Sequence, residues 1–95
     1  MVARVSTYSG DPDALVDGFG GQADAIERIE GFERAYLLVD RDANRAISIT
    51  FWDSLAALES SAEQANRMRE QATSPSGGSI DSVESYEVAM TLGAA

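Results

Sequence analysis

The sequence predicts an α+β fold in the order strand, helix, strand, strand, helix, strand, and three observations lead to this order. Four segments carry the β-branched and alternating residues of strands. Two apolar stripes at helical spacing lie between them, and a polar turn joins the two middle strands. Two βαβ-like halves around a hairpin give a ferredoxin-like arrangement, an antiparallel four-stranded sheet with two helices on one face. Two helices on a β-meander is the less favoured alternative, because crossover connections are right-handed.

The first strand and the first helix occupy the N-terminal third. Residues 2–8 alternate with β-branched and aromatic side chains and predict a strand. Asp11 is a good N-cap, and Pro12 suits the first helical position. We expect a kink or break near Gly20, where glycines weaken the helix, and a helix stop at Gly31. The apolar stripe of this helix consists of Leu15, Phe19, Ala23, Ile26 and Ile29.

A central hairpin follows. Residues 32–40 and 46–52 predict two strands, and the polar residues between them predict the turn. Asn44 is the best candidate in this turn for a left-handed backbone conformation, because asparagine tolerates that region better than most residues.

The second helix begins after an N-cap at Asp53 or Ser54. Residues 73–79 are rich in Ser, Gly and Pro and predict a flexible loop, and residues 83–90 predict the last strand. No repeat or linker interrupts the pattern, so we expect a single domain over residues 1–95. The apolar stripe of the second helix consists of Leu55, Leu58, Ala62, Ala65, Met68 and Ala72.

Composition excludes several functional classes. The chain has 16 acidic and 7 basic residues, a net charge of −9, whereas nucleic acids and anionic membranes need clustered positive charge. We therefore expect neither as a partner. The sequence has no cysteine and no histidine, which removes thiol chemistry and the commonest general base, metal ligand and haem ligand, so neither a metal nor a cofactor is expected. No apolar run approaches the ~20 residues of a membrane span, and a cytoplasmic protein is the expectation.

The strand residues fall into two sets by alternation, and neither set carries the charges of a solvated sheet face, apart from Arg4 and Arg34 near strand ends. The helices can cover only one face. A contiguous apolar patch of this size is rare on a monomer, so we expect the strongly apolar face to pack against a second copy, as a homodimer. That face consists of Val5, Tyr36, Leu38, Ile47, Ile49 and Phe51.

The second set is smaller and more polar, and facing the helices it leaves room for a small aromatic ligand. Trp52 either walls this cleft or plugs the core, and the plug is the favoured interpretation. Arg69 is a candidate to hold a substrate anion, although an ion pair with a nearby glutamate is favoured. The candidate substrate-binding residues are Ser6, Tyr8, Phe19, Ser48, Thr50, Trp52 and Arg69. The catalytic residues are not assigned.

Several runs resemble the antibiotic biosynthesis monooxygenase-like family of dimeric α+β barrel proteins. They are GFERAYLLVDRD at residues 31–42, SITFWDS at residues 48–54, the acidic, Ala-rich helix that follows, and YEV at residues 86–88. The resemblance covers most of the chain and implies a homodimer whose two sheets close into one barrel, with a cleft between each sheet and its helices. It also implies one of three roles: a cofactor-free oxygenase acting on polyketide-derived phenols or quinols, a haem-degrading enzyme, or a protein without known activity.

The departures from this family exclude haem chemistry from the expectation. Haem-degrading relatives use a histidine, an asparagine and a helical tryptophan, and these positions fall near Glu70, Ser6 and Ser61. Cofactor-free relatives use a substrate anion as the electron source, and Trp52 matches their recurring tryptophan. The sequence thus predicts a homodimeric small-molecule-binding protein, with cofactor-independent monooxygenase activity on an aromatic or polyketide-like substrate. The alternative is a catalytically silent binding or accessory protein whose cleft is filled by its own side chains.

Overall fold

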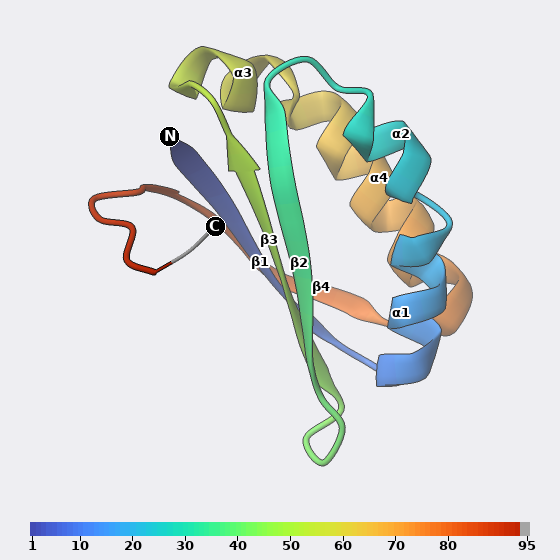
Figure 1. Cartoon of the computed structure of the whole chain (residues 1–95). Helices are drawn as coiled ribbons and strands as arrows, with labels where there is room; N and C mark the ends of the chain where they lie inside the picture. Colours follow the sequence, from blue (N-terminus) through green and yellow to red (C-terminus); the bar gives the residue numbers. More distant parts are fainter. Residues whose placement is uncertain (94–95) are drawn as a thin grey trace.

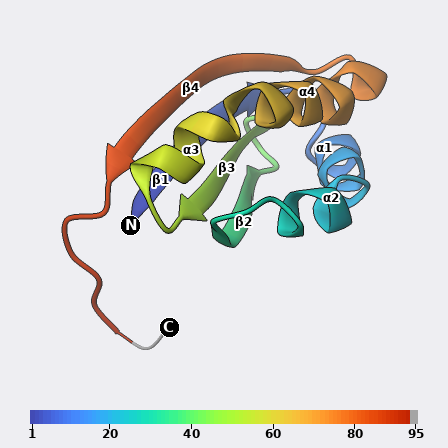
Figure 2. The same cartoon turned by 90° about the horizontal axis from the view of Figure 1, so that it is seen from above.

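The computed structural model describes residues 1–93 and confirms the ferredoxin-like α+β fold. One sheet has the strand order β2-β3-β1-β4, and all neighbouring strands are antiparallel. The helices lie on one side of this sheet (Figure 1), and the view from above shows the sheet curving around α3 and α4 (Figure 2). The elements are β1 (Val2–Ser9), α1 (Pro12–Gly20), α2 (Ala23–Glu27), β2 (Phe32–Asp40), β3 (Arg45–Trp52), α3 (Leu55–Ser60), α4 (Ala62–Thr73), the 3-10 turn η1 (Ser74–Ser76) and β4 (Ser79–Glu87). Within the described residues, no helix has the length and apolar character needed to cross a membrane.

The last strand departs from its predicted bounds. It begins at Ser79 rather than at residue 83 and ends at Glu87 rather than at residue 90. The pairing with β1 sets both limits, because Ser9 pairs with Ser79 and Val2 pairs with Glu87. The start of this edge strand is mostly polar, so its sequence carries no clear strand pattern before residue 83.

The break in the first predicted helix lies where the glycines indicated, between α1 and α2, but Gly31 does not cap either helix. Arg28 caps α2 in the ordinary right-handed region, and Gly31, with φ of 86°, turns the chain into β2. The second predicted helix also breaks, at Ser61, which the sequence did not predict. The Ser61 hydroxyl donates to the Leu58 carbonyl at 2.9 Å, a local bond that competes with helical pairing.

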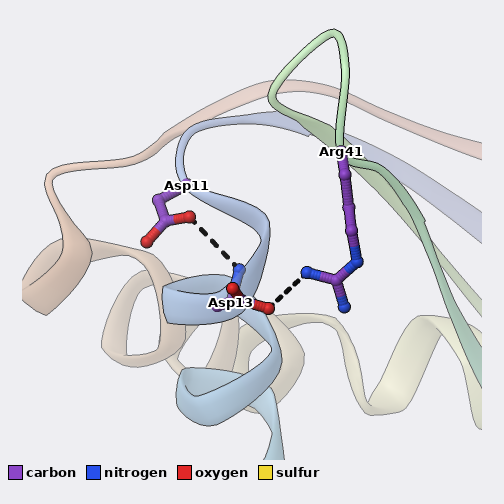
Figure 3. A network of polar contacts seen from close by, with 3 residues as sticks. All are labelled: Asp11, Asp13 and Arg41. Carbon is purple, nitrogen blue, oxygen red and sulfur yellow. Dashed lines mark hydrogen bonds and ion pairs between the residues drawn. The ribbon is translucent and has the colours of Figure 1, made fainter.

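The predicted caps and the hairpin turn are confirmed. Asp11 accepts from the Asp13 amide, Ser54 accepts from the Ala57 amide, and Asn44 has φ of 53°. Arg41 of the turn forms an ion pair with Asp13 at the start of α1 (Figure 3). Both side chains of this pair are exposed, so it contributes less than about 1 kcal/mol to stability.

The pairing of β1 with β3 fixes which side chains face the helices. Arg4 lies opposite Thr50, and Ser6 lies opposite Ser48. Partners in an antiparallel pair share one face, so these four side chains point the same way. They line a cavity together with helix residues, which places the polar set on the helix side as predicted.

The core has its largest buried side chains at both ends of the helix-covered face. Tyr8, Leu15 and Ala46 form one cluster, with the Phe19 ring 5.0 Å from the Tyr8 ring. Trp52 is fully buried at the other end. Burial raises the pKa of the Tyr8 hydroxyl above its ordinary value, and a hydrogen bond with the Ser48 hydroxyl at 2.8 Å partly offsets this effect.

Helices α1 and α4 cross in close contact at Gly18. A Cβ atom at Gly18 would overlap the Ala72 carbonyl oxygen, whereas a Cβ atom at Gly20 would meet nothing within 4 Å. Packing therefore requires a glycine at residue 18, whereas Gly20 makes no such contact and only weakens the helix.

We expect Gly18→Ala to lower the free energy of unfolding by about 1–3 kcal/mol, because the new methyl group forces the two helix backbones apart. Gly20→Ala should instead raise it by up to about 1 kcal/mol, through helix propensity. Urea unfolding followed by circular dichroism measures both. Equal effects of the two substitutions would contradict the close contact.

We expect wild-type stability to fall as pH rises above about 10, since the unfolded chain gives up the Tyr8 proton before the folded chain does. Tyr8→Phe should reduce this fall between pH 9 and 11, and it should cost about 1 kcal/mol at pH 7 through the lost hydrogen bond. Tyr36→Phe, at an exposed position, keeps Tyr8 and serves as the control. An unchanged alkaline slope in Tyr8→Phe would show that Tyr8 does not titrate as described.

Candidate functional site

A cavity of about 780 Å³ lies between the sheet and the helices. This is the volume range of sites for small organic ligands. The central strands contribute polar groups, and α1, α2 and α4 contribute mainly apolar ones. Its lining includes Arg4, Ser6, Phe19, Ile26, Leu37, Ser48, Thr50, Ala65, Met68 and Arg69.

Five of the predicted site residues line this cavity, and two do not. The five come from both layers of the fold and are Ser6, Phe19, Ser48, Thr50 and Arg69. Tyr8 and Trp52 are absent from the lining, and both are fully buried. That any of these residues binds a substrate stays a prediction.

Tyr8 and Trp52 lie behind the lining and hold its hydroxyl groups. Tyr8 shares a hydrogen bond with Ser48, and the Trp52 indole N–H donates to the Thr50 hydroxyl at 2.9 Å. Because Thr50 accepts from Trp52, its own hydroxyl proton is free to point into the cavity. Trp52 is thus a core residue that orients a lining residue.

Arg4 is a buried, charged lining residue that the sequence did not predict as part of the site. It is only 4% exposed, and its guanidinium lies 5.5 Å from the centre of the Trp52 ring, a cation–π contact. Its Nη2 donates to the Leu58 carbonyl at 2.7 Å. Alternation along β1 indicates this position, since Arg4 shares a face with Ser6 and Tyr8, but a place near the end of a strand favours a solvated arginine.

Arg69 is the second buried cation of the cavity. It is 7% exposed and donates to the Asn66 side-chain oxygen. The favoured interpretation of an ion pair with a glutamate is wrong: among residues 1–93, no carboxylate lies within ion-pair distance of Arg69 or of Arg4. Burial lowers the pKa of both arginines, and the charge of Arg69 further lowers the pKa of Arg4, whereas Tyr8 and the carboxylate of Glu70 partly offset the lowering of the pKa of Arg69.

Two polar atoms at the cavity are buried without a hydrogen-bond partner in the described part of the chain, Arg4 Nη1 and Ser6 Oγ. Such groups normally find a partner, because burial alone costs them their hydration. Together with the Ser48 and Thr50 hydroxyls, they form a polar floor under apolar walls. No cluster of three acidic residues suited to a metal occurs among residues 1–93.

Solved structures of other proteins share this architecture. SnoaB, a cofactor-independent oxygenase from Streptomyces nogalater, matches at 23% identity and a TM-score of 0.76, over 96% of this chain and 95% of that chain. A putative antibiotic biosynthesis monooxygenase from Deinococcus radiodurans matches at 16% identity and a TM-score of 0.74, over 100% and 99%. The heme-degrader MhuD from Mycobacterium tuberculosis, with two hemes bound, matches at 22% identity and a TM-score of 0.72, over 98% and 100%.

Sequence relatives come from Mycobacterium tuberculosis. Uncharacterized protein Rv2557 is 38% identical over 66 residues, which is 68% of this chain and 29% of the relative. Uncharacterized protein Rv2558 is 30% identical over 94 residues, which is 95% of this chain and 39% of the relative. The chain thus spans about a third of the length of these relatives. No family model matches the chain. The structural matches confirm the resemblance at the level of the fold, and the chain has the architecture of the antibiotic biosynthesis monooxygenase-like proteins.

Proposed function

We propose that this chain is a homodimeric small-molecule-binding protein that takes an aromatic or polyketide-like compound into its sheet–helix cavity. The observation that carries the proposal is the cavity itself, about 780 Å³ with hydroxyl and guanidinium donors on one wall. Ligand sites of this kind combine apolar walls with a few polar groups that fix orientation. Phe19, Ile26 and Met68 supply apolar walls, and Ser48 and Thr50 supply hydroxyls.

The activity that fits this site is cofactor-independent monooxygenation. The support is the fold shared with a cofactor-independent oxygenase, together with a cavity large enough for an aromatic substrate. The substrate first loses a proton to solvent, and the resulting carbanion or phenolate gives one electron to O₂. The substrate radical and superoxide then form a C–O bond, and a proton from solvent completes the hydroperoxide. Loss of water then leaves a carbonyl in place of a CH₂ group, so that one oxygen atom enters the product and the other leaves as water.

A catalytically silent binding protein is the second candidate function. The observation in its favour is that the carboxylates in the cavity lining, Glu27 and Glu33, are exposed, so neither has the buried environment that tunes a general base. The open cavity argues against the version in which side chains fill the cleft.

The face of the sheet that the helices leave uncovered supports the proposed homodimer. Tyr36 and Leu38 on β2 are 50% and 49% exposed, and the Tyr36 ring lies 6.2 Å from the Phe51 ring of β3. Val5, Ile47 and Ile49 continue this apolar surface. Two such faces packed on each other would bury it and close a barrel.

We expect a dimer at micromolar concentration by light scattering. Leu38→Glu should convert it to a monomer, because a carboxylate on the apolar face has no partner across the interface. Leu55→Glu is the matched control, since Leu55 is 56% exposed but lies on α3, away from the sheet face. A monomeric wild-type protein would refute the dimer.

We expect 1-naphthol and anthrone to perturb the fluorescence of Trp52, the chain's single tryptophan, which contacts the lining through Thr50. Ala23→Phe should weaken binding at least about tenfold by occupying the cavity. Ala25→Phe, on the same short helix but outside the lining, should leave binding unchanged. Equal affinities in the two variants would place the ligand elsewhere.

Oxygen uptake separates the two functions. An oxygenase should consume one O₂ per anthrone oxidised, faster than the uncatalysed reaction and without added metal or flavin, and Ala23→Phe should slow it. Ligand binding with uptake at the uncatalysed rate would favour the silent binding protein.

A further inference from the structure

We propose that the cavity selects aromatic ligands that carry one anionic oxygen group, bound by Arg4 and Arg69. The anionic group is a carboxylate, an enolate or a phenolate. This inference rests on the proposed binding of a small molecule in the same cavity and adds the charge class of that molecule.

The first ground is the state of Arg4. Its side chain is more than nine-tenths buried, lines the cavity and keeps Nη1 without a partner among the described residues. An isolated buried charge is costly, and proteins keep one where a counter-charge binds. A ligand oxygen within reach of Nη1 would supply that counter-charge through a charge-assisted hydrogen bond.

Structural contacts account for only part of Arg4, because its guanidinium packs over the Trp52 ring and donates from Nη2 to Leu58, and neither contact gives Nη1 a hydrogen-bond partner. Its one hydrogen bond, from Nη2, goes to the Leu58 carbonyl. That carbonyl also accepts from the Ser61 hydroxyl at 2.9 Å, so it keeps a partner if the guanidinium is removed. The hydrogen bond between Arg4 of β1 and Leu58 of α3 therefore does not by itself require a charged donor.

The second ground is Arg69, which adds a like charge in the same cavity. Two buried guanidinium groups repel each other, and each holds only neutral oxygens in the described chain. The buried charges of the cavity are thus both positive, in a chain of net charge −9, whereas the lining carboxylates of Glu27 and Glu33 are exposed. A protein so acidic repels anions in general, so any preference for an anion must come from this cavity.

The apolar residues of the lining indicate what the remainder of the ligand is. Phe19, Ile26 and Met68 line the cavity from the helices, and Leu37 lines it from β2 beside Ser48, so these side chains suit a flat apolar ring system rather than a small hydrated ion. Ser6 Oγ, also without a partner in residues 1–93, lies on the same face of β1 as Arg4 and is placed to share the same anionic group.

The test uses a matched ligand pair, 2-naphthoate and its neutral isostere 2-naphthamide, titrated by calorimetry at pH 7. Wild-type protein should bind the naphthoate about 10- to 100-fold more tightly, the range of a charge-assisted bond. Arg4→Met and Arg69→Met should abolish this preference and leave naphthamide affinity within about twofold, while Arg4→Lys should restore part of it. Arg67→Met, an exposed arginine of the same helix as Arg69 and outside the lining, is the control and should keep it.

Thermal unfolding provides a second readout. Arg4→Met should not lower the unfolding midpoint, because it removes a buried unpaired charge, and 2-naphthoate should raise the wild-type midpoint but not that of Arg4→Met. Arg69→Met and Arg4→Lys cover the case in which Arg4→Met fails to fold.

The outcomes separate this inference from the proposed function. Equal affinity for the two probes, or a preference that survives both Arg4→Met and Arg69→Met, overturns the anion site while leaving the small-molecule cavity intact. If the protein binds none of the four compounds, 2-naphthoate, 2-naphthamide, 1-naphthol and anthrone, the proposed function is overturned.

Discussion

The antiparallel register between β1 and β3 is the constraint on which the rest of this molecule depends. It sets Arg4 opposite Thr50 and Ser6 opposite Ser48, so that one side of the two central strands carries small polar groups and a cation. A slip of one residue would exchange the two faces, sending Ile47, Ile49 and Phe51 to the helices and the hydroxyls outward. The cavity volume follows from this choice, because serine and threonine fill less of the space between sheet and helices than the apolar set would.

Tyr8 and Trp52 are buried outside the cavity lining, and each forms a hydrogen bond with a hydroxyl of the lining. Each uses its polar atom to hold a lining hydroxyl, Ser48 in one case and Thr50 in the other. The apolar bodies of these rings therefore stabilise the fold while their polar tips order the site, a division typical of amphipathic aromatic residues. Arg4 completes the pattern by stacking over Trp52. The charge it brings into the interior is a stability cost that a functional site commonly carries.

Local chemistry made most of the fold predictable. Asp11, Ser54 and Asn44 act at their own positions, where capping and turn preferences depend on few neighbours, and alternation sorted the two sheet faces. The start of β4 was missed because its polar residues form a strand only through pairing with β1, and the break at Ser61 was missed because a serine within an apolar stripe carries no distinctive pattern. Arg4 was misjudged because no local signal distinguishes a solvated strand-end arginine from one enclosed by a helix that arrives 54 residues later in the chain.

The contact of α1 with α4 at Gly18 has a mechanical consequence. Where one backbone rests directly on another, no side chain can change rotamer to let the helices separate, so this side of the cavity is stiff. Helix α2 differs, because it spans five residues, none of them buried, and its N-terminus has no side-chain cap. Opening free energy is lowest in such segments. Of the two helices, α2 is therefore the part of the cavity wall that we expect to open at the lower free energy, and α1 at its contact with α4 the part that we expect to stay in place.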